Sequence, residues 1–99
     1  MTKIYNITMN TPFGIQQGKI TFVIKDESLT GTLEGMGSKS KFNNGKINGN
    51  SFEFSGQIRT LITSIQYTAK GTLNNDMLSA AVNTKYGVFS VIGKLVSQS

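Results

Sequence analysis

The sequence contains no cysteine, no histidine and no tryptophan, and it has one proline in 99 residues. Without cysteine there can be no disulfide framework, thiolate zinc site or thiol nucleophile. Without histidine the chain lacks the commonest general base and metal ligand. The five acids are Asp26, Glu27, Glu34, Glu53 and Asp76, which fall in predicted turns or on outward strand positions. We therefore predict a protein that is not an enzyme and holds no metal and no cofactor.

Long apolar runs are also missing. No stretch approaches the roughly 18 residues of a membrane-spanning helix, and the chain does not begin with a charged segment followed by an apolar one, as a secretory signal does. We expect a cytoplasmic protein with no membrane part. A length of 99 residues corresponds to one domain with a modest core, so residues 1–99 are taken as a single domain.

Positive charge is in excess, with ten Lys and Arg against five Asp and Glu and a net charge of +5. Such an excess raises the question whether nucleic acid is a partner. The lysines, however, are spread along the chain and concentrate only in residues 39–46. Binding of single-stranded nucleic acid also needs outward aromatic side chains on which bases can stack. The candidates are Phe13, Tyr86 and, depending on register, Phe42. Weak binding of single-stranded nucleic acid is therefore the least favoured function.

What the sequence does contain is alternation of apolar and polar residues, as in Ile20–Ile24, Phe52–Ser55 and Ile65–Lys70. A two-residue period is typical of half-buried strands. Turn signals interrupt it at intervals of about 10 to 13 residues, a spacing typical of sandwiches and barrels. The seven turns are Thr11–Gly14, Lys25–Ser28, Gly35–Ser38, Asn48–Asn50, Thr60–Thr63, Asn74–Asp76 and Thr84–Gly87. We predict an all-β, eight-stranded antiparallel meander that closes into a small barrel, with a flattened β-sandwich as the alternative.

Tight hairpin loops fix which residues lie opposite each other. The second loop places Phe22 opposite Gly31, and the fifth places Gly56 opposite Tyr67. A large ring over a strand glycine lets a sheet coil, which favours closure. The predicted inward positions are Tyr5, Ile7, Met9, Ile20, Phe22, Ile24, Leu29, Leu33, Ile47, Phe52, Phe54, Ile58, Ile65, Tyr67, Leu78, Val82, Phe89 and Val91. Of these, Tyr5, Phe22, Phe54, Tyr67 and Phe89 are the large aromatic residues that we expect to fill the barrel interior.

The later loops continue the same inward face, and only the fourth strand needs a further assumption. Centring the sixth loop on residues 74–75 places Ala69 opposite Ala80. In the fourth strand, Phe42 faces inward only if a β-bulge in residues 43–45 resets the register.

Loops of a meander alternate between the two ends of the barrel, and here the ends differ in chemistry. The even-numbered loops are compact and polar. The odd-numbered loops carry large apolar side chains, namely Phe13, Met36, Leu61, Ile62 and Tyr86. Four such loops at one end predict one of three arrangements. They are a plug over the lumen, a mouth for a small apolar ligand, and a surface for a second copy or a partner. We expect a non-enzymatic binding module that uses this end, with a structural or homo-oligomerising module as the alternative.

The segment Leu29-Thr30-Gly31-Thr32, between a polar hairpin turn and Glu34-Gly35, resembles the avidin and streptavidin family of small calycin-type barrels. The resemblance implies a barrel that binds a small ligand. The biotin site of that family depends on tryptophan, which this chain lacks, so no biotin residue is carried over. The Thr-Pro-x-Gly turn, residues 29–32, residues 45–52 and Lys70-Gly71-Thr72 also resemble a group of small bacterial proteins, a likeness that implies no function.

Overall fold

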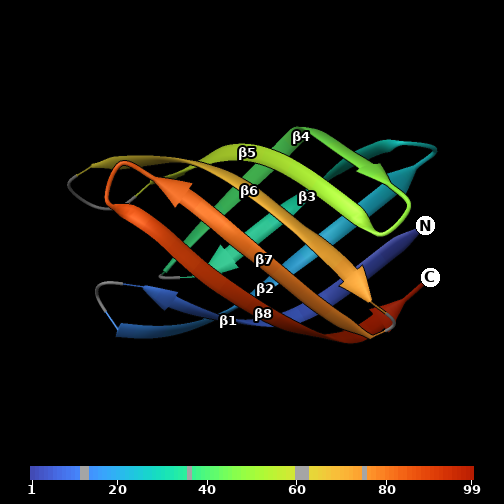
Figure 1. The fold of residues 1–99 in the computed structure, drawn as a ribbon, viewed down its shortest axis with the longest axis horizontal. Helices are drawn as coiled ribbons and strands as arrows, with labels where there is room; N and C mark the ends of the chain where they lie inside the picture. Colours follow the sequence, from blue (N-terminus) through green and yellow to red (C-terminus); the bar gives the residue numbers. More distant parts are fainter. Residues whose placement is uncertain (12–13, 36, 60–62, 75) are drawn as a thin grey trace.

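The computed structural model describes residues 1–11, 14–35, 37–59, 63–74 and 76–99. Within these ranges the chain forms eight β-strands and no helix (Figure 1). The strands are β1 (Thr2–Thr11), β2 (Gly14–Lys25), β3 (Ser28–Gly35), β4 (Ser38–Asn48), β5 (Ser51–Arg59), β6 (Ser64–Asn74), β7 (Met77–Thr84) and β8 (Gly87–Gln98).

Each strand is antiparallel to the next, and β1 also pairs with β8, so the sheet is a closed barrel. In the closing ladder Met9 lies opposite Val91 and Tyr5 opposite Leu95. Thr2 and Ser99 extend it by exchanging backbone hydrogen bonds of 2.7 and 2.8 Å. The predicted eight-stranded meander barrel is therefore confirmed, and the flattened sandwich is not what forms.

The hairpin registers follow the sequence pattern at all but one loop. Phe22 lies opposite Gly31 and Gly56 opposite Tyr67, as predicted. The sixth register was wrong, because Ala69 lies opposite Val82 and not opposite Ala80. Asn74 itself pairs with Met77, so the loop is centred one residue later than we assumed. The resulting shift of two residues leaves every side chain on its predicted face.

The bulge expected in β4 is present. Leu29 lies opposite Gly45 but Gly31 lies opposite Phe42, so two residues of β4, Asn43 and Asn44, face one residue of β3. The extra residue turns Phe42 into the barrel, where its side chain is 4% exposed.

Aromatic rings fill the middle of the barrel and the part toward the even-numbered loops. The Phe22 ring lies 5.2 Å from that of Phe52, 5.9 Å from that of Phe54 and 6.1 Å from that of Phe42, centroid to centroid. Phe42 and Phe54 stack at 3.9 Å, and the Tyr5 ring meets Phe22 edge-on at 5.9 Å. An eight-stranded barrel is just wide enough for its inward side chains to meet. This cluster therefore closes one half of the lumen.

Candidate functional site

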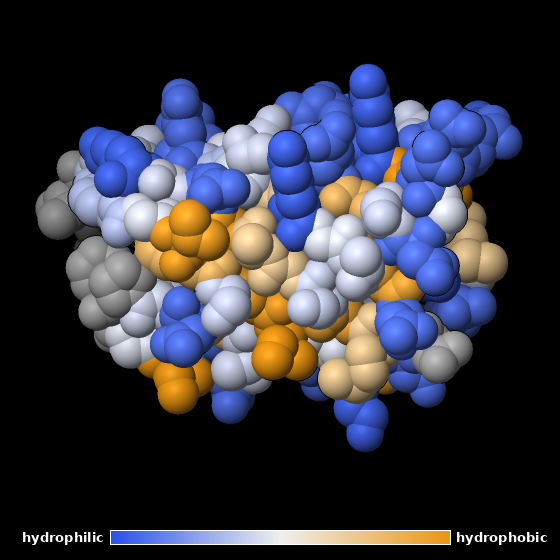
Figure 2. Space-filling model, viewed as in Figure 1, coloured by the Kyte–Doolittle hydropathy of each residue, from blue (hydrophilic) through white to orange (hydrophobic). Residues whose placement is uncertain are grey.

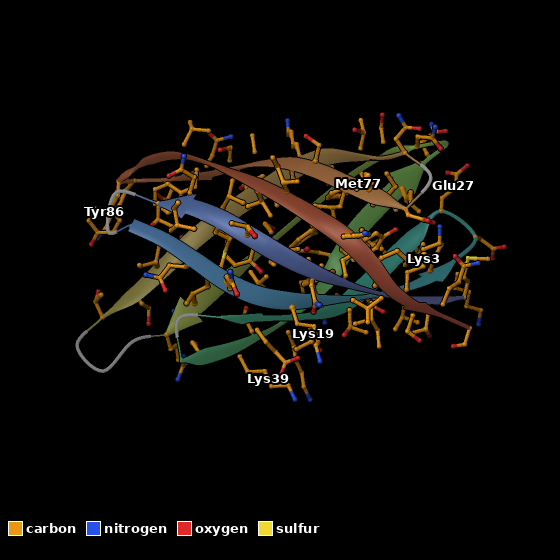
Figure 3. All side chains as sticks on the ribbon, turned by 90° about the horizontal axis from the view of Figure 1, so that it is seen from below. Lys3, Lys19, Glu27, Lys39, Met77 and Tyr86 are labelled. Carbon is orange, nitrogen blue, oxygen red and sulfur yellow. The ribbon has the colours of Figure 1, made fainter. Side chains whose placement is uncertain are left out.

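The two ends of the barrel separate as the meander predicts. Figure 3 shows Tyr86 at the end formed by the odd-numbered loops, and Lys3 and Glu27 at the opposite end. We call these the odd-loop end and the even-loop end. Tyr86 is 45% exposed, and the Lys85 Nζ atom lies 5.2 Å from the centre of its ring. The other residues of the predicted surface, Phe13, Met36, Leu61 and Ile62, lie outside the described residues, so that surface stays a prediction.

The lumen keeps open space in the half that belongs to the odd-loop end. An apolar cavity of about 40 Å³ lies there. On the side of the even-loop end it is bounded by the phenylalanine cluster, which we define as Phe22, Phe42, Phe52 and Phe54. Its wall toward the odd-loop end includes Ile58, Ile65, Ala80, Val82 and Phe89. Phe89 faces inward as predicted but is only half-buried, unlike Tyr5, Phe22, Phe54 and Tyr67, which are buried. The space arises where small side chains stand opposite one another: Ala69 faces Val82 and Ala80 faces Val91.

Two hairpins with the same Thr-x-x-Gly pattern bring threonines to the mouth of this cavity. Thr11 Oγ1 donates to the Gly14 carbonyl at 2.7 Å, and Thr84 Oγ1 donates to the Gly87 carbonyl at 3.1 Å. The Tyr86 amide in turn donates to Thr84 Oγ1 at 3.0 Å. Because these hydroxyls bond within their own turns, the threonines add methyl surface to the lining, and the exposed lining is entirely apolar. The Thr-x-x-Gly pattern predicts the two turns, but it does not predict that their threonine methyl groups line the cavity.

The size and chemistry of the cavity decide what can occupy it. One water needs about 10 to 15 Å³ of such space and two to four polar partners. The cavity offers about 40 Å³ but no polar surface. Water therefore gains little by entering, whereas an apolar molecule of a few heavy atoms would exchange bulk water for apolar contacts.

Two tyrosine hydroxyls are buried in the barrel. Neither Tyr5 Oη nor Tyr67 Oη has a hydrogen-bond partner among the described residues. Burial raises the pKa of both phenols. The Asp76 carboxylate raises the pKa of Tyr5 further, and the nearby Ser40 hydroxyl offsets part of the rise in the pKa of Tyr67 without reaching good hydrogen-bond geometry. These groups are held neutral, which suits an apolar interior and not proton transfer.

We expect the raised pKa values to make the protein less stable in alkali. In the unfolded chain tyrosine ionises near about pH 10, so above that pH the unfolded state binds fewer protons than the folded state and stability falls as pH rises. Below about pH 10 the two tyrosines are protonated in both states, so their contribution to the free energy of unfolding is fully present. Urea unfolding between pH 8 and pH 11 should show a steeper decline for the native protein than for the Tyr5→Phe/Tyr67→Phe variant. Parallel curves for the two proteins would contradict the assignment.

A second apolar feature lies on the outside of the barrel. Val88, Ile92 and Val96 of β8 are 65%, 57% and 56% exposed, and Ile15 of β2 is 71% exposed. Figure 2 shows hydrophobic side chains on the face that carries β7, β8 and β1, while hydrophilic ones dominate over β4 to β6. We missed this face in the sequence. The sequence signal is that β8 has apolar residues at both its inward and its outward positions. A strand with one face in water would alternate apolar and polar residues.

The structure also weakens the case for binding of single-stranded nucleic acid, because one of the three candidate stacking residues is not exposed. Phe42, a candidate for base stacking if it faced outward, is buried in the aromatic cluster. In the described ranges no group of three or more Asp or Glu residues could hold a metal ion. No helix in the same ranges is long and apolar enough to cross a membrane.

Comparison with known protein families and with curated proteins found none that matches this chain. The resemblance to avidin-like barrels therefore stays a prediction.

Proposed function

We propose that this protein is a non-enzymatic binding module that takes up a small apolar molecule in its lumen from the odd-loop end. The observation that carries the proposal is the cavity of about 40 Å³, whose exposed lining is wholly apolar. The phenylalanine cluster blocks the other half of the lumen, so the route from the even-loop end is closed. Pockets with an apolar wall at the mouth of a barrel are common sites for small ligands.

The cavity limits the ligand to a compact or narrow apolar group. Three or so waters would occupy the same space, which corresponds to a small ring or a short alkyl chain unless side chains move. Phe89 and Val82 stand opposite each other near the mouth, and both are only partly buried. Their contact with a guest would bury apolar surface that the free protein leaves exposed, at about 25 cal/mol per Å².

The test uses benzene as an apolar probe and thermal or urea unfolding as the readout. Ligand at ten times its Kd stabilises the folded state by about 1.4 kcal/mol. We expect Ala80→Leu to abolish this stabilisation, because its side chain enters the cavity, whereas Ala81→Leu on the outer face should retain it. Equal responses of the two variants would rule out the lumen as the site. Native mass spectrometry of protein purified from its own source would then identify a natural occupant.

A second candidate function, self-association, is favoured by the exposed aliphatic side chains of β8. We propose that this outer face, not the odd-loop end, is the surface through which two copies meet. Val88, Ile92 and Val96 recur at every fourth residue, with Ser90 and Lys94 as the outward residues between them. A strip of this kind is unusual on a monomer, since exposed strand faces are normally polar.

Light scattering at increasing protein concentration tests this candidate. We expect the native protein to form dimers and Ile92→Lys to shift it to monomer, because a buried unpaired charge at the centre of an apolar interface is costly. Ser90→Lys, at the neighbouring outward position of the same strip, should weaken the dimer as well. A native protein that is monomeric at all concentrations rules out this function.

A further inference from the structure

The sequence contains two Asn-Gly steps, Asn44-Gly45 and Asn48-Gly49, which lie close together in β4 and in the turn that follows it. An asparagine before glycine loses its side-chain amide readily, because glycine has no Cβ atom to hinder the approach of its backbone nitrogen to the asparagine Cγ atom. In a folded protein the reaction also needs access for water and freedom for the backbone to bend. Since the two steps share one sequence, a difference between them must arise from the fold.

The Asn44 side chain is held by two hydrogen bonds across the barrel wall. Its Nδ2 atom donates to Ser55 Oγ at 2.9 Å, and its Oδ1 atom accepts from the Ser55 backbone amide at 3.2 Å. Both bonds direct the amide group toward β5. The Asn44 Cγ atom therefore cannot turn back to the Gly45 nitrogen unless both bonds break.

Gly45 itself is buried and closely packed. It lies opposite Leu29 of β3, and a Cβ atom on Gly45 would be 2.7 Å from the Leu29 carbonyl oxygen and 3.1 Å from the Phe54 Cβ atom. Contacts this close leave no room for the backbone rotation that closing a five-membered ring requires. Burial also keeps hydroxide away from the Gly45 amide. The fold therefore protects the first Asn-Gly step in two independent ways.

The second step, Asn48-Gly49, differs at each of these points. It lies at the tip of the β4–β5 turn, at the even-loop end, where both chain termini also lie (Figure 1). Asn48 and Gly49 are both exposed, and no described residue comes within 4 Å of a Cβ atom placed on Gly49. Among the described residues no side-chain hydrogen bond includes the Asn48 amide group. Water and hydroxide therefore reach both reacting groups.

The geometry of the turn leaves the Gly49 nitrogen available. Asn48 pairs with Ser51, so Gly49 and Asn50 form a two-residue loop, and Gly49 takes a φ of +61° at its first position. In such a hairpin the flanking residues make the ladder hydrogen bonds. The Gly49 amide is thus outside the ladder, and its conformation is one that glycine adopts without strain.

We propose that Asn48 is a site of spontaneous deamidation in the folded protein, whereas Asn44 is protected. The Gly49 nitrogen loses its proton to hydroxide and attacks the Asn48 Cγ atom. A C–N bond forms, the side-chain nitrogen leaves as ammonia, and a cyclic imide results. Water then opens the ring at either of its two carbonyl groups, which gives aspartate or isoaspartate. This chemistry does not depend on either function proposed above.

The modification changes both the charge and the length of the turn. One new carboxylate lowers the net charge from +5 to +4. In the isoaspartate product the side-chain methylene becomes part of the main chain, so the loop that sets the register of β4 and β5 is lengthened by one atom. We therefore expect the change to be confined to the even-loop end, away from the cavity.

Tryptic digestion separates the two sites for measurement. Cleavage after Lys41, Lys46 and Arg59 places Asn44 in the peptide 42–46 and Asn48 in the peptide 47–59. The native protein and the protein unfolded in urea are incubated in parallel at pH 8. Mass spectrometry then follows the replacement of the amide by a carboxyl group, and a methyltransferase specific for isoaspartate measures that product.

We expect both peptides to be modified in the urea-unfolded protein. In the native protein the peptide 42–46 should react about tenfold or more slowly than in urea, because reaction there requires local opening. The peptide 47–59 should keep a rate within about threefold of its rate in urea, because the exposed turn needs no such opening. The rate at Asn48 should rise with pH, since the attacking nitrogen is the deprotonated one.

The Asn48→Ser variant is the control, because the same peptide also contains Asn50. This substitution is on the surface, and circular dichroism should confirm that the variant folds. We expect its peptide 47–59 to remain unmodified. Modification that persists in this variant would assign the reaction to Asn50 and overturn the proposal. Equal rates for the two peptides of the native protein, or protection of both, would also overturn it.

Discussion

Replacing Phe22 with alanine is expected to lower the free energy of unfolding by about 3 to 5 kcal/mol, the usual range for deleting a well-packed phenylalanine. Phe22 is fully buried, and four aromatic rings surround it at centroid distances of 5.2 to 6.1 Å. The four rings come from β1, β4 and β5, so the space left by the ring cannot close without moving three strands. Aromatic pairs of this geometry add stability beyond the area they bury.

Urea unfolding at 25 °C measures this loss. Val23→Ala is the matched control, because the next residue of β2 faces outward and is 41% exposed, and we expect it to cost less than about 1 kcal/mol. Phe22→Leu should fall between the two. A Phe22→Ala variant within 1 kcal/mol of the native protein would contradict the packing of the cluster.

Replacing Gly31 with alanine should lower the free energy of unfolding by a comparable amount. A Cβ atom at this position would clash with the carbonyl oxygen of Thr21 and would lie 3.0 Å from the ring of Phe42. The first contact is with the backbone of β2, so the ladder between β2 and β3 would have to separate to admit one methyl group. We expect a cost at or above the upper end of the roughly 1–3 kcal/mol seen for overpacked cores.

Gly37→Ala is the control for this substitution. None of the described residues lies within 4 Å of a Cβ there, and the φ angle of +71° leaves only the cost of a left-handed backbone, about 1 kcal/mol. The two variants are compared by urea unfolding and by circular dichroism. If Gly31→Ala is no less stable than Gly37→Ala, the close approach of β2 and β3 at Gly31 is wrong.

Most of the fold follows from the sequence because the alternation and the hairpin turns constrain each other. A tight loop fixes a register, and a register that placed Phe22 or Tyr67 outside would have broken the pattern. The bulge in β4 was predictable for the same reason, since without it Phe42 would face water. The sixth register was missed because Asn74 can end a strand or begin a turn, and both choices keep Ala69 and Leu78 inward.

The candidate sites were less predictable because each depends on distances between strands. The cavity exists because Ala69 and Ala80 face Val82 and Val91 across neighbouring ladders, and alternation says nothing about the summed volume of such neighbours. Which loops share an end of the barrel, in contrast, followed from counting the loops of the meander.

Crystallography under xenon pressure is the most direct test of the lumen as a binding site. Xenon enters dry apolar cavities and is located by its electron density. We predict a xenon atom inside the barrel among Ile65, Ala80 and Phe89, which line the cavity. A barrel without xenon in its lumen, or with xenon only against the outer face of β8, would contradict the proposed function.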